Sequence, residues 1–134
     1  MASLMDIEGI GDVYYHKLRA VGIGTTDGLL ERGASPKGRA EIAEQSGISE
    51  KLILEWVNHA DLFRVKGVGS EYSDLLEEAG VDTIPELAQR NPDNLYQKLV
   101  EVNQAKHLVR RLPTPAQVKD WVAQAGRMPR VITY

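Results

Sequence analysis

Apolar residues recur along this chain at helical spacing. The clearest stripe, with intervals of three and four residues, lies between 50 and 64 and consists of Leu52, Ile53, Trp56, Val57, Ala60 and Phe63. Together with start and stop signals, the pattern predicts helices near 12–21, 26–32, 36–46, 50–64, 70–79, 84–90, 92–111 and 115–126. We therefore expect an all-α fold without a β-sheet.

Several of these helices have recognisable start signals. A capping residue stands directly before a proline at Ser35-Pro36, Asn91-Pro92 and Thr114-Pro115. Thr114 with Gln117, and Thr83 with Glu86, also have the spacing of a capping box, in which each side chain accepts the backbone amide of the other residue.

The chain repeats itself at an offset of 58 residues. Ile7-Glu8-Gly9-Ile10-Gly11 returns as Val65-Lys66-Gly67-Val68-Gly69, and seven of the 23 aligned positions are identical. A fixed offset of this kind is typical of a duplicated supersecondary unit. We predict one domain made of two repeats, about 1–64 and 65–126, followed by a tail at 127–134.

The repeated glycines suggest how each unit turns. The first glycine, Gly9 or Gly67, can take a positive φ and so end the preceding segment. The second glycine allows the backbone to approach a neighbour closely. The apolar residue between them, Ile10 or Val68, is expected to fix the turn to the core.

Composition excludes several classes of protein. With 134 residues, 43% hydrophobic and 26% charged, the chain has the profile of an ordinary globular domain. It has no cysteine, which removes disulfides, thiolate metal sites and cysteine nucleophiles. No segment has the apolar length of a membrane span, and residues 1–8 lack the basic and apolar regions of a signal peptide. A cytoplasmic protein is expected.

Charge is unevenly distributed along the chain. The net charge is −3, but residues 102–134 carry six basic residues and one acidic residue, a net charge of +5. Residues 1–101 therefore carry 10 basic and 18 acidic residues, a net charge of −8. We expect an anionic partner to bind near the C-terminal third.

The best candidate for such contact is the predicted helix 92–111. Its helical spacing places Asn103, Lys106, His107 and Arg110 on one face, with Arg111 at the edge. The alternative is that this face is simply solvated, as charged helix faces usually are.

The residues around Gly9 and Gly67, with Tyr14, Leu18, Tyr72 and Leu76, resemble helix-hairpin-helix motifs. More closely, the chain resembles a family of small bacterial tandem helix-hairpin-helix proteins classed as a domain of unknown function. The segments that carry this closer resemblance are 48–64, 71–112 and 121–134.

The resemblance implies a role for the hairpin backbone. In related hairpins of DNA ligases, excinucleases and branch-migration proteins, backbone amides contact phosphates without reading sequence, often beside a bound monovalent cation. By this resemblance, phosphate contact would fall on Gly9, Ile10 and Gly11, and on Gly67, Val68 and Gly69. A monovalent cation at the hairpins is the only cofactor that it suggests.

The flanking residues distinguish the two hairpins. Glu8 and Asp12 would repel a phosphate at the first hairpin, whereas Arg64, Lys66 and Ser70 favour one at the second. DNA-binding relatives usually carry Lys or Arg directly after the second glycine, where this chain has Asp12 and Ser70. The alternative is that both hairpins only pack helices together, since a fold does not decide a function.

Two other functions compete with nucleic-acid binding. An enzyme is not expected, because His16, His59 and His107 are dispersed and no nucleophile or phosphate-loop motif is present. A protein–protein adaptor is the second hypothesis, with Trp121 and the tail 127–134 as its contact surface and no nucleic-acid binding.

Overall fold

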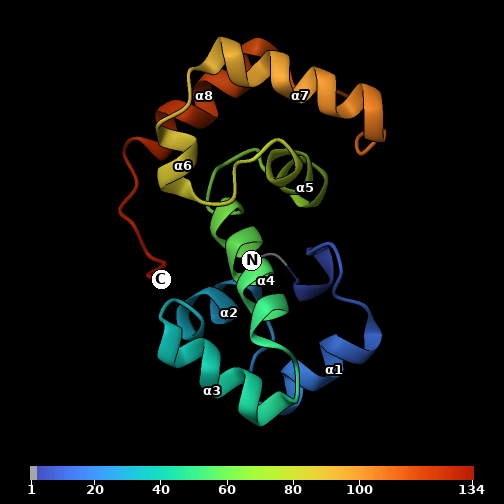
Figure 1. The fold of residues 1–134 in the computed structure, drawn as a ribbon, viewed down its shortest axis with the longest axis vertical. Coiled ribbons are helices and arrows are strands. Elements are labelled where there is room, and N and C mark those ends of the chain that lie inside the picture. The colour runs from blue at the N-terminus through green and yellow to red at the C-terminus, as the bar shows by residue number, and fades with distance from the viewer. Residues whose placement is uncertain (1–2) are drawn as a thin grey trace. The chain divides into compact units, whose positions relative to one another are not determined.

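All regular structure in residues 3–134, which are the residues that the computed structural model describes, is helical (Figure 1). Contacts between residues divide the chain into two compact units. Unit 1 contains the residues up to Asp61 together with Val131–Tyr134, and unit 2 contains Leu62–Arg130.

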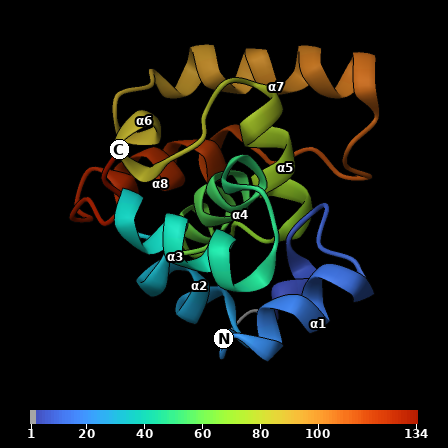
Figure 2. The same ribbon diagram turned by 60° about the horizontal axis from the view of Figure 1, so that its bottom comes forward.

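Unit 1 contains a short 3₁₀ helix and four α-helices (Figure 2). These are η1 (Leu4–Asp6), α1 (Asp12–Ala20), α2 (Thr26–Arg32), α3 (Pro36–Ser46) and α4 (Glu50–Leu62). α3 contacts both α1 and α2, and α1 contacts η1. Fully buried apolar side chains of these elements include Leu4, Leu18, Leu29, Ile42, Ile53 and Trp56.

Unit 2 contains α5 (Ser70–Glu78), α6 (Ile84–Ala88), α7 (Pro92–Lys106) and α8 (Pro115–Ala125). α8 packs against α6 and α7, and α5 packs against α7. The buried core of this unit includes Leu75, Leu76, Leu87, Leu95, Leu99, Val118 and Trp121.

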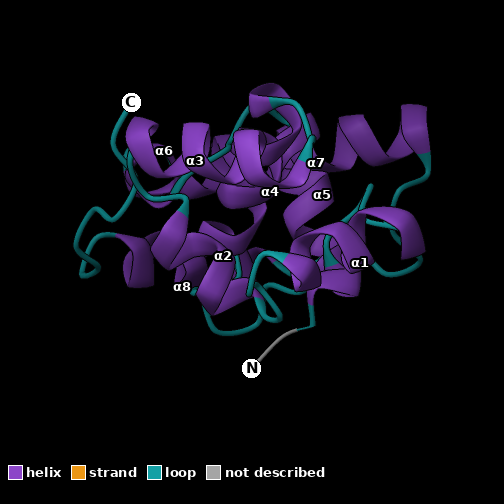
Figure 3. Ribbon diagram, turned by 90° about the horizontal axis from the view of Figure 1, so that it is seen from below, coloured by secondary structure: helices purple, strands orange, loops and turns teal. Residues whose placement is uncertain are grey.

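The predicted helices are confirmed, with one correction. All eight begin at the predicted residue, and seven end within two residues of the predicted end. The helix predicted at 92–111 instead ends at Lys106. The expected absence of a sheet holds for residues 3–134, which contain no strand (Figure 3). The only β-type pairing in these residues is an isolated bridge between Ser3 and Thr25.

The predicted caps are mostly confirmed. Ser35, Asn91 and Thr114 each accept a backbone amide at the start of a helix, and Thr114 and Gln117 make both bonds of a capping box. Of the capping box predicted for Thr83 and Glu86, only one of the two hydrogen bonds forms. Thr83 accepts the amide of Glu86, but the Glu86 carboxylate accepts the amide of Asp82 (3.1 Å).

The two units share an order of four helices. In each unit a glycine turn leads into two short helices, a third helix begins with a proline, and a fourth helix carries a buried tryptophan. The fourth helices share Trp-Val-x-x-Ala, at 56–60 and at 121–125. Unit 2 is longer because α7 has 15 residues where α3 has 11, and because a longer connection follows it.

Candidate nucleic-acid interface

The two glycine turns have the same backbone geometry. We call residues 7–11 turn 1 and residues 65–69 turn 2. Gly9 and Gly67 have φ of 95° and 98°, which confirms the predicted positive φ. The amide of Ile10 donates to the carbonyl of Ile7 (3.2 Å), and in turn 2 the amide of Val68 donates to the carbonyl of Val65 (3.1 Å).

The helix after each turn begins without a side-chain cap. Gly11 precedes α1 and Gly69 precedes α5, both in extended conformation and neither able to offer a capping oxygen. The first amide that bonds back to the start of α5 is that of Ser73, to the carbonyl of Gly69 (2.8 Å). The amides before it are helix-terminal donors at the positive end of the helix dipole. The backbone at both turns therefore has the chemistry of an anion site.

A buried tryptophan supports each turn from within its unit. The ring centroid of Trp56 lies 5.0 Å from that of Tyr14, and that of Trp121 lies 5.2 Å from that of Tyr72. A Cβ on Gly9 would lie 3.4 Å from Trp56 Nε1, and one on Gly67 would lie 3.1 Å from Trp121 Nε1. Both first glycines are thus favoured by their positive φ, and at Gly67 the close approach of an indole also disfavours a side chain.

Turn 2 is also held by a polar clamp from α8. Gln124 Oε1 accepts the backbone amide of Lys66 (2.9 Å), and Gln124 Nε2 donates to the carbonyl of Lys66 (3.0 Å). The same Nε2 donates to Asp120 (2.8 Å), which orients the side-chain amide. The backbone of Lys66 is fixed by these bonds while its side chain is exposed.

The charges around the two turns differ in sign. Residues 6–14 contain Asp6, Glu8 and Asp12 and no basic residue, a net charge of −3. Residues 64–72 contain Arg64, Lys66 and Glu71, a net charge of +1. Turn 2 therefore favours an anion more than turn 1 does.

The predicted basic helix face does not exist. α7 ends because His107 takes a left-handed conformation (φ 52°, ψ 49°), which His adopts more readily than most residues. The side chain of Asn103 then accepts the amide of Val109 (3.0 Å) and donates to its carbonyl (3.3 Å). These local bonds compete with helix continuation. Lys106 is also engaged, in an ion pair with Glu78 at the far end of α5.

The connection from His107 to Thr114 instead bonds through its backbone to the first turn of α5. The hydroxyl of Tyr72 donates to the backbone carbonyl of Arg111 (3.0 Å). Tyr72 lies in the first turn of α5, three residues after the uncapped Gly69. The structure therefore bonds the backbone of Arg111 to a residue in the first turn of α5 and leaves the side chains of Arg110 and Arg111 exposed, whereas Lys106 pairs with Glu78 at the other end of α5.

The remaining predicted contact residues are partly engaged within the fold. Arg64 Nη2 donates to the carbonyl of Pro129 (3.1 Å). Trp121 is only 1% exposed, and Ile132 in the tail is 2% exposed. An adaptor could not use either side chain as a surface anchor in this structure.

Residues 3–134 show no sign of two other kinds of site. They contain no group of three His, Asp or Glu side chains arranged to hold a metal ion. Within the same residues, no helix combines the length and apolar character needed to cross a membrane.

Comparison with known proteins places the chain in a family. No solved structure is significantly similar to it. A family model matches residues 8–128, which is most of the chain. The match confirms that the chain belongs to a domain-of-unknown-function family, the one described as Domain of unknown function (DUF4332).

Proposed function

We propose that this chain is a non-catalytic protein that binds the phosphate backbone of nucleic acids at turn 2, without reading the sequence. Turn 2 with α5 and α6 is then a helix-hairpin-helix motif, and turn 1 with α1 and α2 is its duplicate. The observation that carries the proposal is the uncapped start of α5 at Gly69, with the exposed Lys66 in turn 2 and the backbone of the exposed Arg111 bonded to Tyr72 of α5.

The chemistry of this surface suits a phosphodiester. The amides of Ser70 and Glu71 precede the hydrogen-bond ladder of α5, so a phosphate oxygen can accept them at the positive helix end. Lys66 and Arg111 would neutralise the charge of that phosphate or its neighbour. No side chain here is arranged to read base edges, so contact with phosphate would set position and not sequence.

The net charge of the protein limits the affinity. Most of the chain is acidic, and only a few cations surround turn 2. Binding should therefore be weak and strongly reduced by salt. If three phosphates are neutralised, the slope of log K against log salt concentration should be about −3 on duplex DNA.

A charge-matched pair of double variants tests the proposal. Lys66→Glu with Arg111→Glu should reduce affinity by at least roughly tenfold at low salt, because the proposal assigns both cations to the bound phosphates. Lys17→Glu with Lys37→Glu changes the net charge equally in unit 1 and should have a much smaller effect. Fluorescence anisotropy with random-sequence single- and double-stranded probes measures both. Equal losses, or no binding by the native chain at tens of micromolar protein, would refute turn 2 as the site.

The monovalent cation suggested by the resemblance would share the backbone oxygens of turn 2 with hydrogen bonds. The carbonyl oxygens of Val65 and Lys66 already accept hydrogen bonds, from the amide of Val68 and from Gln124. Each of these oxygens keeps a second lone pair that a cation could use, but phosphate contact through the amides of α5 does not require a cation.

An adaptor function is the second candidate, supported by one observation at turn 1. Val13 is 66% exposed and Met5 is 44% exposed, on the neighbouring elements α1 and η1. Apolar side chains beside the acidic Glu8 and Asp12 suit a protein partner better than a phosphate. Capture of a purified partner that is lost in Val13→Asp but retained in Lys37→Glu would support it.

A further inference from the structure

The last residues of the chain are held by unit 1 through their backbone. The amide of Thr133 donates to the carbonyl of Ala34 (2.7 Å), and the carbonyl of Thr133 accepts Arg39 Nη2 (2.8 Å). Both backbone groups of one residue are therefore bound. Backbone contact of this kind is how many proteins bind extended peptides of limited sequence preference.

Side chains on both sides of Thr133 add selectivity. Ile132 is 2% exposed and lies in the core of unit 1. The hydroxyl of Tyr134 donates to Asn58 Oδ1 on α4 (3.0 Å), and its ring centroid lies 5.7 Å from the guanidinium carbon of Arg39. Unit 1 thus contacts three consecutive residues in different ways: the apolar side chain of Ile132, the backbone of Thr133 and the hydroxyl of Tyr134.

Arg39 is a specialised residue for this contact. It is only 7% exposed and donates to the carbonyl of Gly33 (2.9 Å) as well as to Thr133. The third residue after the proline that begins α3 is Arg39, whereas the third residue after the proline that begins α7 is Leu95, which is fully buried. Unit 1 has a buried cation where unit 2 has an ordinary core residue.

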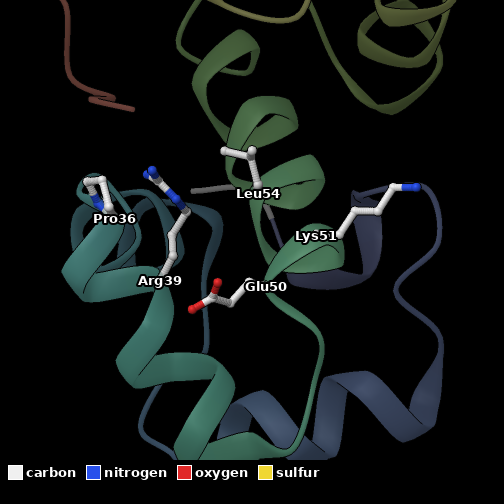
Figure 4. A pocket seen from close by; sticks show the side chains of 5 residues that line it. All are labelled: Pro36, Arg39, Glu50, Lys51 and Leu54. Carbon is white, nitrogen blue, oxygen red and sulfur yellow. The ribbon is translucent and has the colours of Figure 1, made fainter.

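The surface extends beyond the residues that the tail covers. A pocket of about 340 Å³ between α3 and α4 is lined by Pro36, Arg39, Glu50, Lys51 and Leu54 (Figure 4). Arg39 belongs both to this pocket and to the contact with Thr133. The tail therefore occupies part of a larger surface of unit 1.

The tail is joined to unit 2 by a segment without regular structure. α8 ends at Ala125, and of residues 126–130 only Met128 is not exposed. Residues 131–134 could therefore leave unit 1 without any change in the helices of unit 2. A tethered ligand can be replaced by an identical ligand from another molecule, and exchange of such segments produces dimers.

We infer that unit 1 is a docking site for an extended peptide with the chemistry of residues 131–134, and that its partner is the same segment of a second copy of this chain. The second copy is the partner because it carries a segment that the surface is already shown to fit. In the native chain its own tail competes for the site at an effective concentration on the order of millimolar.

Emptying the site in the full chain tests this inference. Ile132→Asp should undock the tail, because a carboxylate cannot replace a buried isoleucine. A labelled peptide of residues 128–134 should then bind this variant at least roughly tenfold more tightly than it binds the native chain. Arg130→Asp, which places a carboxylate on an exposed neighbour, should behave like the native chain. The same peptide with aspartate in place of Ile132 should not bind.

A second variant separates docking from folding. Thr133→Pro removes the amide and the hydroxyl that both donate to the carbonyl of Ala34, keeps the carbonyl that accepts Arg39 Nη2, and should also free the site for the peptide. Native chain refolded at high concentration should give dimers in sedimentation experiments, and neither variant should. A variant with native helical circular dichroism that fails to bind the peptide would overturn the inference. So would loss of folding in both variants, since the tail would then be a fixed part of unit 1.

Discussion

Turn 1 and turn 2 have the same backbone geometry but differently charged surfaces. The φ of the first glycine differs by only 3° between them, and both turns lie against a Trp–Tyr pair. Their charges, however, are −3 for residues 6–14 and +1 for residues 64–72. The shared features are those that the fold needs, because they concern backbone conformation and burial. The features that differ are the ones a ligand would meet.

Each unit also carries an addition that the other lacks. The longer connection after α7 bonds to α5 in unit 2, through the carbonyl of Arg111 and the hydroxyl of Tyr72. Unit 1 has a short connection there and instead receives residues 131–134. We therefore expect the two units to respond alike to changes in packing and differently to changes at the surface.

The largest effect should come from the supporting tryptophans, and it should be similar in both units. Trp56→Ala and Trp121→Ala each remove a buried aromatic side chain and should cost about 3–5 kcal/mol of unfolding free energy. Urea denaturation followed by circular dichroism measures the loss, and the remaining tryptophan reports by fluorescence on the other unit. Val13→Ala, at an exposed position, should change stability by less than about 0.5 kcal/mol. A loss below about 1 kcal/mol at Trp121 would contradict its supporting role.

The next largest loss of unfolding free energy should come from the first glycine of each turn, and it should be larger at turn 2. Gly9→Ala and Gly67→Ala both force a side chain into a positive φ, at a cost of about 1–2 kcal/mol. Gly67→Ala should cost more, because its Cβ would lie 3.1 Å from an indole nitrogen and not 3.4 Å.

A control isolates the steric part of this effect. Gly80 has a φ of 93° but no atom within 4 Å of an added Cβ. Gly80→Ala should therefore report the conformational cost alone. If Gly67→Ala destabilises no more than Gly80→Ala in chemical denaturation, the contact with Trp121 does not constrain the turn.

Most of the fold could be predicted from the sequence because its signals are local. Proline after a capping residue placed the starts of α3, α7 and α8, and the spacing of apolar residues identified α4. The positive φ of Gly9 and Gly67 followed from a repeated glycine pattern. Each of these depends on residues within one or two turns of helix.

The candidate site was harder to predict because it depends on contacts between distant residues. The helix period alone placed Lys106 and Arg110 on one face, since nothing local shows that Asn103 bonds to Val109 across the end of α7. Trp56 and Trp121 occupy equivalent positions in the two units, and both stand in the sequence Trp-Val-x-x-Ala. The two tryptophans are 65 residues apart, whereas the glycine turns are 58 residues apart, so the repeat found at the turns did not reveal this equivalence.

A smaller loss of stability should follow from releasing the connection between α7 and α8. Asn103→Ala removes both bonds to Val109 and should destabilise unit 2 by about 1 kcal/mol. It should also weaken nucleic-acid binding, because Arg111 is no longer held near Tyr72. His107→Gly relaxes a left-handed residue without touching these bonds, and should leave binding unchanged while stability stays equal or rises. Thermal melts and anisotropy titrations of both variants measure the two effects, and unchanged binding in Asn103→Ala would remove the connection from the proposed interface.

The smallest effect on stability should be the most informative about function. Serine in place of Gly11 or Gly69 adds a capping oxygen where both glycines are extended and an added Cβ meets no atom within 4 Å. Serine and glycine differ by only a few tenths of a kcal/mol at this position, so both variants should melt like the native chain. In Gly69→Ser, however, the new hydroxyl accepts the amides that we assign to a phosphate, and in Gly69→Asp a carboxylate also repels it. Affinity for a random-sequence probe at low salt should therefore fall in Gly69→Ser and further in Gly69→Asp, and should hardly change in Gly11→Ser. Equal losses at the two glycines would mean that the turns are not functionally distinct. No loss at either would mean that the helix starts do not bind the phosphate, even if the surrounding cations do.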